Sequence, residues 1–160
     1  MQLSRQADYA IRLLFELAVR PGEVRDVRSI AAASGVPAAY GAKLIQSLAR
    51  SGLVRTQRGA RGGVWLNQKP EEVTLQQVVE AVEGPTVYAR CLLWPRECPA
   101  DRPCPMHDFL DGLSQAVSGY LSSVRLSDLV EQARRITAEY GSQDNTAGED
   151  DAPASQDSGA

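Results

Sequence analysis

The sequence has few of the side chains that carry most enzyme chemistry. It contains one histidine and three cysteines in 160 residues, and it has no glycine-rich phosphate-binding motif. A single histidine leaves little material for the paired acid, base and nucleophile arrangements of hydrolytic enzymes. We therefore expect a protein that is not an enzyme and that has no small-molecule substrate.

Long hydrophobic runs are also missing. No stretch approaches the roughly 18 apolar residues that a membrane span requires, and the first residues are charged and amphipathic, unlike a secretory signal. These features predict a cytoplasmic protein without a membrane partner. In a reducing compartment, an odd number of cysteines favours metal binding or redox sensing over disulfides.

Acidic residues are absent between Val27 and Pro70, and the charge is unevenly divided along the chain. Residues 1–70 carry eleven Lys and Arg against four Asp and Glu, a net charge of +7, whereas residues 71–160 have a net charge of −10. A basic half of this kind favours a polyanionic partner.

Two short helices with a glycine-containing turn are predicted within this basic half. A first helix, capped by Ser4, is expected to reach about Arg20, and a short helix capped by Ser29 should end near Ala33. A following helix from Pro37 to Arg50 completes a helix-turn-helix, the arrangement in which a recognition helix enters a DNA major groove. Any short helical hairpin shares this pattern, so DNA binding requires further support.

That support comes from the next segment, which predicts a β-hairpin wing. Residues 53–57 and 63–67 alternate as two short strands, and the turn between them carries Arg58 and Arg61. Guanidinium groups at such a tip suit phosphates or a narrow minor groove. The predicted DNA-binding residues, with Tyr40 and Lys43 as base readers, are Arg28, Pro37, Ala39, Tyr40, Lys43, Ser47, Arg50, Arg55, Thr56, Arg58, Gly59 and Arg61.

The remaining segments predict an assembly element and a tail. Thr74 caps a helix that ends at Gly84, and a long helix from about Met106 to Arg125 carries an apolar stripe without an obvious partner in the chain. Such a stripe typically packs against a second copy, which predicts a homodimer. Ser127 is expected to cap a last helix, and residues 141–160 form an acidic tail that we expect to be disordered.

All three cysteines and the histidine fall in one short segment between these elements. Cys91, Cys98, Cys104 and His107 follow the pattern C-x6-C-x5-C-x2-H, among prolines that oppose regular helix or strand. Zinc sites usually pair cysteines more closely, and a metal-free reactive thiol is a further alternative. An iron–sulfur cluster accepts wider loops between its ligands.

These residues together resemble the IscR and NsrR group of bacterial winged-helix regulators, the Rrf-type family. The resemblance covers about residues 1–130, and it implies a DNA-binding repressor whose promoter binding is controlled by an iron–sulfur cluster near a dimer helix. It rests on residues 8–12 (DYAIR), the helix-turn-helix with Tyr40, residues 52–54 (GLV), the tip at residues 58–63, the three cysteines and residues 126–130 (LSDLV).

The resemblance implies two possible fourth ligands. IscR-like members hold a 2Fe-2S cluster with three cysteines and a histidine three positions after the last, which is the spacing of Cys104 and His107. NsrR-like members hold a 4Fe-4S cluster with three cysteines and an aspartate from the partner subunit, at the place of Asp8. The first cysteine gap is six residues here against five in familiar members, so both cluster types remain open.

The expected fold is mainly α with a small β-hairpin wing: a winged helix-turn-helix domain followed by a long dimerisation helix. Its expected parts are a DNA-binding domain (1–84), a cysteine-rich cluster-binding loop (85–105), the dimerisation and closing helices (106–140) and the acidic tail (141–160). The expected function is a homodimeric regulator that binds double-stranded promoter DNA under control of the cluster. A zinc- or thiol-based winged-helix sensor, or a redox or metal-carrier protein that uses the winged domain for protein contacts, is the alternative.

Overall fold

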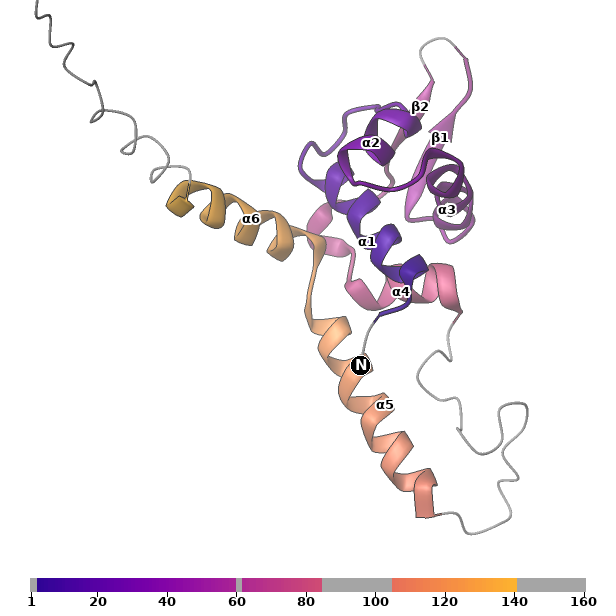
Figure 1. The fold of residues 1–160 in the computed structure, drawn as a ribbon, viewed down its shortest axis with the longest axis vertical. Coiled ribbons are helices and arrows are strands. Elements are labelled where there is room, and N and C mark those ends of the chain that lie inside the picture. Colours follow the sequence, from indigo (N-terminus) through magenta and orange to yellow (C-terminus); the bar gives the residue numbers. More distant parts are fainter. Residues whose placement is uncertain (1–2, 60–61, 85–104, 141–160) are drawn as a thin grey trace, which may run out of the picture. The chain divides into compact units, whose positions relative to one another are not determined.

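The computed structural model describes residues 3–59, 62–84 and 105–140 (Figure 1). The chain divides into one unit of residues 1–130 and a second of residues 131–160. The elements are α1 (Arg5–Ala18), α2 (Val27–Ala33), α3 (Ala38–Arg50), β1 (Val54–Gln57), β2 (Gly63–Leu66), a 3-10 turn η1 (Pro70–Glu72), α4 (Leu75–Glu83), α5 (Pro105–Ser123) and α6 (Leu126–Tyr140). The expected mainly α fold with a two-stranded wing is confirmed.

Helix α1 lies at the centre of the first unit. Ser4 begins it as predicted, because its hydroxyl accepts a hydrogen bond from the Ala7 amide at 3.1 Å. The apolar stripe of α1, which includes Leu13, Leu14 and Leu17, is buried against α2, α3, α4 and β2. Complete burial of one Leu side chain stabilises the fold by roughly 1.5–3 kcal/mol.

The wing has a third, very short partner that the sequence pattern does not indicate. Strand β2 pairs with β1 in antiparallel register, Arg55 lying opposite Trp65. On its other edge, Val64 exchanges two backbone hydrogen bonds with Arg25, at 2.8 and 2.9 Å. Because Arg25 lies in the connection between α1 and α2, this pairing fixes the base of the wing to the helices.

Within the first unit, a second backbone bridge joins the start of α4 to the end of α5. Thr74 caps α4 in a reciprocal capping box with Gln77, as expected for its position. The Leu75 amide donates to the Val124 carbonyl at 2.9 Å, and the Leu126 amide donates to the Val73 carbonyl at 3.0 Å. These two hydrogen bonds hold the C-terminal end of α5 against the start of α4.

Two predicted caps are wrong. Helix α2 begins two residues before Ser29, because the Asp26 carboxylate accepts from the Ser29 amide at 3.0 Å and a carboxylate is favoured at a helix start. Helix α6 begins at Leu126 and not after Ser127, since the Asp128 carboxylate accepts from the Arg125 amide at 2.8 Å.

None of the helices that the structure describes combines the length and the apolar character needed to cross a bilayer. In the second unit, residues 131–140 continue α6 and carry an exposed ion pair between Glu131 and Arg135. The cysteine-rich segment 85–104 and the acidic tail 141–160 lie outside the described residues.

A substitution at Gly63 tests the pairing that holds the wing. A Cβ atom there would lie 2.5 Å from the Arg25 carbonyl oxygen, a backbone atom that cannot move alone. We expect Gly63→Ala to lower the free energy of unfolding by about 1–3 kcal/mol, the usual cost of overpacking, in urea denaturation followed by circular dichroism.

The matched control is Gly112→Ala in α5, where a Cβ atom meets nothing within 4 Å. There we expect a gain of up to about 1 kcal/mol from the higher helix propensity of alanine. Equal free energies of unfolding for Gly63→Ala and the wild type would contradict the assigned role of the Arg25 pairing.

Candidate nucleic-acid interface and cluster ligands

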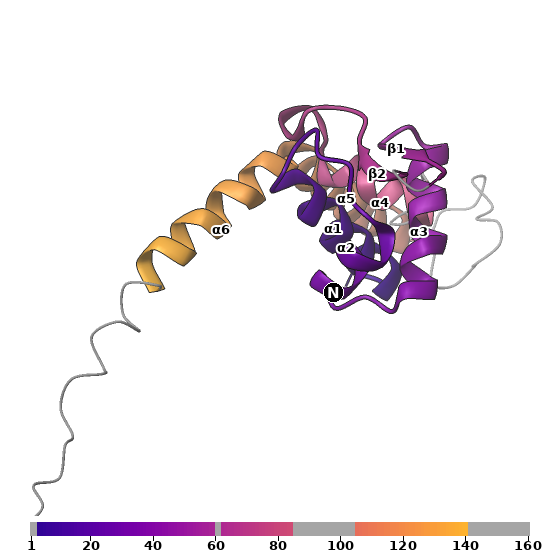
Figure 2. The ribbon, with the colours of Figure 1, turned by 90° about the horizontal axis from the view of Figure 1, so that it is seen from above.

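Helices α2 and α3 form the predicted helix-turn-helix. They approach closely, since a Cβ atom on Gly41 of α3 would lie 3.2 Å from the Ala31 Cβ of α2. The inward side chains of the pair, including Ile30 and Leu48, are fully buried in the core. Both ribbon views place α3 at the margin of the helical group, with the wing next to it (Figures 1 and 2). One face of α3 is therefore open to a partner.

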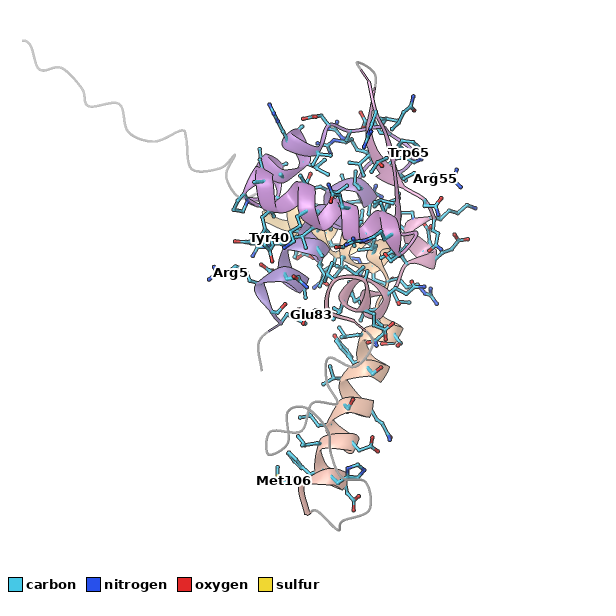
Figure 3. All side chains as sticks on the ribbon, turned by 90° about the vertical axis from the view of Figure 1, so that its right-hand side faces the viewer. Arg5, Tyr40, Arg55, Trp65, Glu83 and Met106 are labelled. Atoms are coloured by element: carbon cyan, nitrogen blue, oxygen red, sulfur yellow. The ribbon has the colours of Figure 1, made fainter. Side chains whose placement is uncertain are left out.

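The predicted DNA-binding residues differ in how far their side chains are exposed to solvent. Tyr40 and Ser47 are half-buried, and Arg61 lies outside the described residues. The exposed ones lie on α2, on α3 and on the wing, and they are Arg28, Pro37, Ala39, Lys43, Arg50, Arg55, Thr56, Arg58 and Gly59. Figure 3 looks onto α3, with Tyr40 towards one end and Arg55 of the wing beyond the other. The structure thus brings most of the predicted set onto neighbouring elements.

The four acidic residues of the same half have other partners than these cations. Asp8 pairs with Arg12 at 3.0 Å, and the carboxylates of Glu16 and Glu23 each lie 3.7 Å from an arginine nitrogen, of Arg25 and Arg20 respectively. The fourth acid, Asp26, caps α2. Each acid of residues 1–70 therefore has a partner on α1, on the following connection or at the start of α2, and none of them forms an ion pair with a residue of α3 or of the wing strands.

The basic side chains of the helix-turn-helix and wing are left uncompensated. Within the described part of the chain, no carboxylate forms an ion pair with Arg28, Lys43, Arg50, Arg55 or Arg58. Uncompensated surface cations of one sign raise the local positive potential. We call these five side chains the basic face.

Tyr40 occupies a position that sequence reasoning did not foresee. Its ring meets that of Tyr9 edge-to-face, with centroids 5.7 Å apart and planes at 76°. Its hydroxyl donates to Gln6 Oε1 at 3.5 Å, and the Gln6 amide nitrogen in turn donates to the Val82 carbonyl. Gln6 thereby links α3 to the last turn of α4. Tyr40 is thus partly engaged in packing between helices.

Of the predicted cluster ligands, only His107 and Asp8 are among the residues that the structure describes. Cys91, Cys98 and Cys104 lie outside the described residues, and among those described no group of three metal-ligating side chains occurs. His107 is exposed in the first turn of α5. Asp8 is in the first turn of α1, where Oδ1 accepts from Arg12 Nε at 3.0 Å. Three thiols with an imidazole or a carboxylate are a donor set that suits an iron–sulfur cluster.

Comparison with known proteins gives consistent matches over most of the chain. The Rrf2 family model, described as an iron-dependent transcriptional regulator, matches residues 3–132. The regulator NsrR of Bacillus subtilis is 30% identical over 138 residues, covering 85% of this chain and 94% of that protein. The regulator IscR of Photorhabdus laumondii is 29% identical over 147 residues, covering 91% of this chain and 88% of that protein.

Solved structures agree with the sequence matches. The structure of CymR of B. subtilis, the global cysteine regulator of that organism, superimposes with a TM-score of 0.68 at 27% identity, covering 82% of this chain and 98% of CymR. These proteins are transcriptional regulators, which confirms the expectation that the chain is not an enzyme.

Proposed function

The chain belongs to the Rrf2 family of transcriptional regulators, and from that premise we propose a cytoplasmic, homodimeric repressor whose promoter binding is controlled by an iron–sulfur cluster. The observation that carries DNA binding is the basic face, because none of the four acids of the same half forms an ion pair with its five cations. A surface of this kind binds a polyanion with an affinity that falls steeply with salt.

The proposed contacts follow the usual division of labour in winged helix-turn-helix proteins. Helix α3 enters the major groove, where Lys43 is exposed for contact with base edges. The arginines of β1 and of the wing tip, Arg55 and Arg58, extend to the flanking phosphates or the minor groove. Two copies related by a two-fold axis then occupy a pseudo-palindromic operator.

The apolar face of α5 supports the homodimer. Phe109, Leu113 and Tyr120 share one side of the helix and are exposed by 63%, 42% and 70%. Large apolar side chains gathered on one helix face typically mark a contact surface. A second copy of α5 offers the same stripe, so the two helices can cover each other.

The proposed ligands are Cys91, Cys98 and Cys104, completed by His107 or by Asp8 of the partner subunit. The cluster, when bound, supplies thiolate-held iron whose stability depends on redox state, nitric oxide or iron supply. His107 is exposed, and its imidazole forms no hydrogen bond with another described residue, so the ring is available. Asp8 would have to exchange its contact with Arg12 for a ligand bond.

The hydrogen bonds of Gln6 support a route from the ligand segment to the DNA-binding helix. The cysteine segment follows directly after α4, whose last turn accepts from Gln6 at Val82. Gln6 also accepts from Tyr40 in the first turn of α3. A change in the segment that shifts the end of α4 therefore alters the support of α3, a differential interaction of the kind that allostery requires.

A cluster-free sensor is the second candidate. The similarity to CymR, a global cysteine regulator, favours regulation by cysteine supply or thiol chemistry on the same winged fold. Under that candidate, the three cysteines would act as reactive thiols or zinc ligands. Both candidates bind DNA, and they differ in whether the three cysteines hold an iron–sulfur cluster.

Arg58→Ala tests the DNA interface. Removal of one phosphate contact should reduce the slope of log Kobs against log salt concentration by about one, measured by fluorescence anisotropy on a promoter duplex. Arg134→Ala on α6 removes the same charge from a residue that is not one of the five of the basic face, and it should leave the slope unchanged. Equal slopes for both variants would contradict the assignment of Arg58.

Leu113→Glu tests the dimer helix. A charge on the apolar face should weaken dimerisation by at least about tenfold, since an unpaired carboxylate is costly to bury, and sedimentation equilibrium measures this. Ser122→Glu places the same charge on the opposite, exposed face of α5 and should leave the dimer intact. If Leu113→Glu dimerises like the wild type, α5 is not the dimer contact.

Cys98→Ala tests the cluster. The anaerobically purified variant should lose visible absorption and iron while remaining folded and dimeric. Parallel spectra of His107→Ala and Asp8→Ala should show the same loss in only one of them, which identifies the fourth ligand. A colourless wild-type protein that contains zinc and still binds DNA would exclude the cluster and favour the second candidate.

A further inference from the structure

The exposed face of α3 is composed mainly of small side chains with two polar ones at its centre. Lys43 and Gln46 are three residues apart and both exposed, with Arg50 one turn further along the same side. The outward residues of the first half are Ala38, Ala39 and Ala42. Alanines hold no polar side-chain group, so side-chain hydrogen bonds from this part of α3 to base edges fall to Lys43 and Gln46.

The other polar side chains of α3 each have a hydrogen-bond partner within the protein. The Tyr40 hydroxyl donates to Gln6 Oε1, and Arg50 Nη2 donates to Ser47 Oγ at 3.0 Å. Within the part of the chain that the structure describes, the side chains of Lys43 and Gln46 form no hydrogen bond with another residue. Their full hydrogen-bonding capacity is therefore available to an external partner.

The two side chains differ in what they recognise. The lysine ammonium only donates, which suits the acceptor pair O6 and N7 of guanine. The glutamine amide donates and accepts from one planar group, and that combination matches N6 and N7 of adenine in the major groove. The alanines beside Gln46 allow the helix backbone to approach the bases and leave room for a thymine methyl group.

We infer that Gln46 is a specificity-determining residue that reads an adenine in each half-site of the operator. The inference rests on the proposed DNA-binding function and extends it, because Gln46 is absent from the set that the sequence pattern indicated. The planar amide contacts the adenine edge with two hydrogen bonds, while the basic face binds the phosphates without sequence preference.

Selection from a randomised duplex library tests the inference. DNA is selected with full-length wild type, Gln46→Ala and Gln46→Arg. The wild type is first tested in its anaerobically purified and its metal-chelated form, and the form with the higher DNA affinity is used for all three proteins. We expect the wild-type motif to contain a symmetry-related adenine that Gln46→Ala no longer selects, with affinity for the wild-type motif reduced roughly 10- to 100-fold. Gln46→Arg should select guanine at the same position, because arginine donates to both O6 and N7.

The matched control is Gln68→Ala, an exposed glutamine between β2 and α4, which should select the wild-type motif. An unchanged motif for Gln46→Ala, or an equal loss of affinity for all sequences, overturns the inference while leaving the proposed function intact. A wild-type protein that selects no motif and shows no salt-dependent DNA affinity overturns both.

Discussion

Burial of one face of α1 is the interaction on which the rest of the first unit depends. The same helix contacts α2, α3, α4 and β2, and Leu13, Leu14 and Leu17 are almost completely removed from solvent. Since these contacts are shared, no neighbouring element can move far without exposing apolar surface of α1. The helix-turn-helix and the wing therefore have their positions fixed by one common partner, which is what a DNA-binding surface requires.

The second constraint is electrostatic. Each acid in the basic half contacts a nearby partner. Three of them form ion pairs with arginines of α1 or of the following connection, and Asp26 caps α2. The exposed pairs contribute little stability, because solvent screens them. Their larger effect is on the basic face, since none of these four carboxylates forms an ion pair with one of its five cations. The positive charge of the basic face therefore stays available to a partner.

Local signals in the sequence predicted the elements, and long-range polar contacts limited what could be predicted of the site. The caps at Ser4 and Thr74 and the apolar periods of α1 and α3 are short-range patterns, and the structure agrees with them. Ser29 and Ser127 failed as caps because both lie inside their helices, which begin earlier: Asp26 accepts from the Ser29 amide at the start of α2, and Asp128 accepts from the Arg125 amide just before α6. Gln6 and Gln46 were not predicted, because an isolated polar residue forms no periodic pattern. The role of Gln6 depends on contacts with elements that are distant in sequence, and that of Gln46 depends on which face of α3 is exposed. The cysteine ligands remain a sequence prediction, because their segment lies outside the described residues.

The backbone bridge between residues 73–75 and 124–126 has an evolutionary consequence. It joins the start of α4 to the end of α5 by two hydrogen bonds, so the chain between them, which includes the cysteine segment, begins and ends at this bridge. A change in the length of residues 85–104 leaves both of these hydrogen bonds in place, because neither bond involves a residue of that segment. The winged helix-turn-helix can therefore keep its arrangement while the sequence between the two joined ends varies.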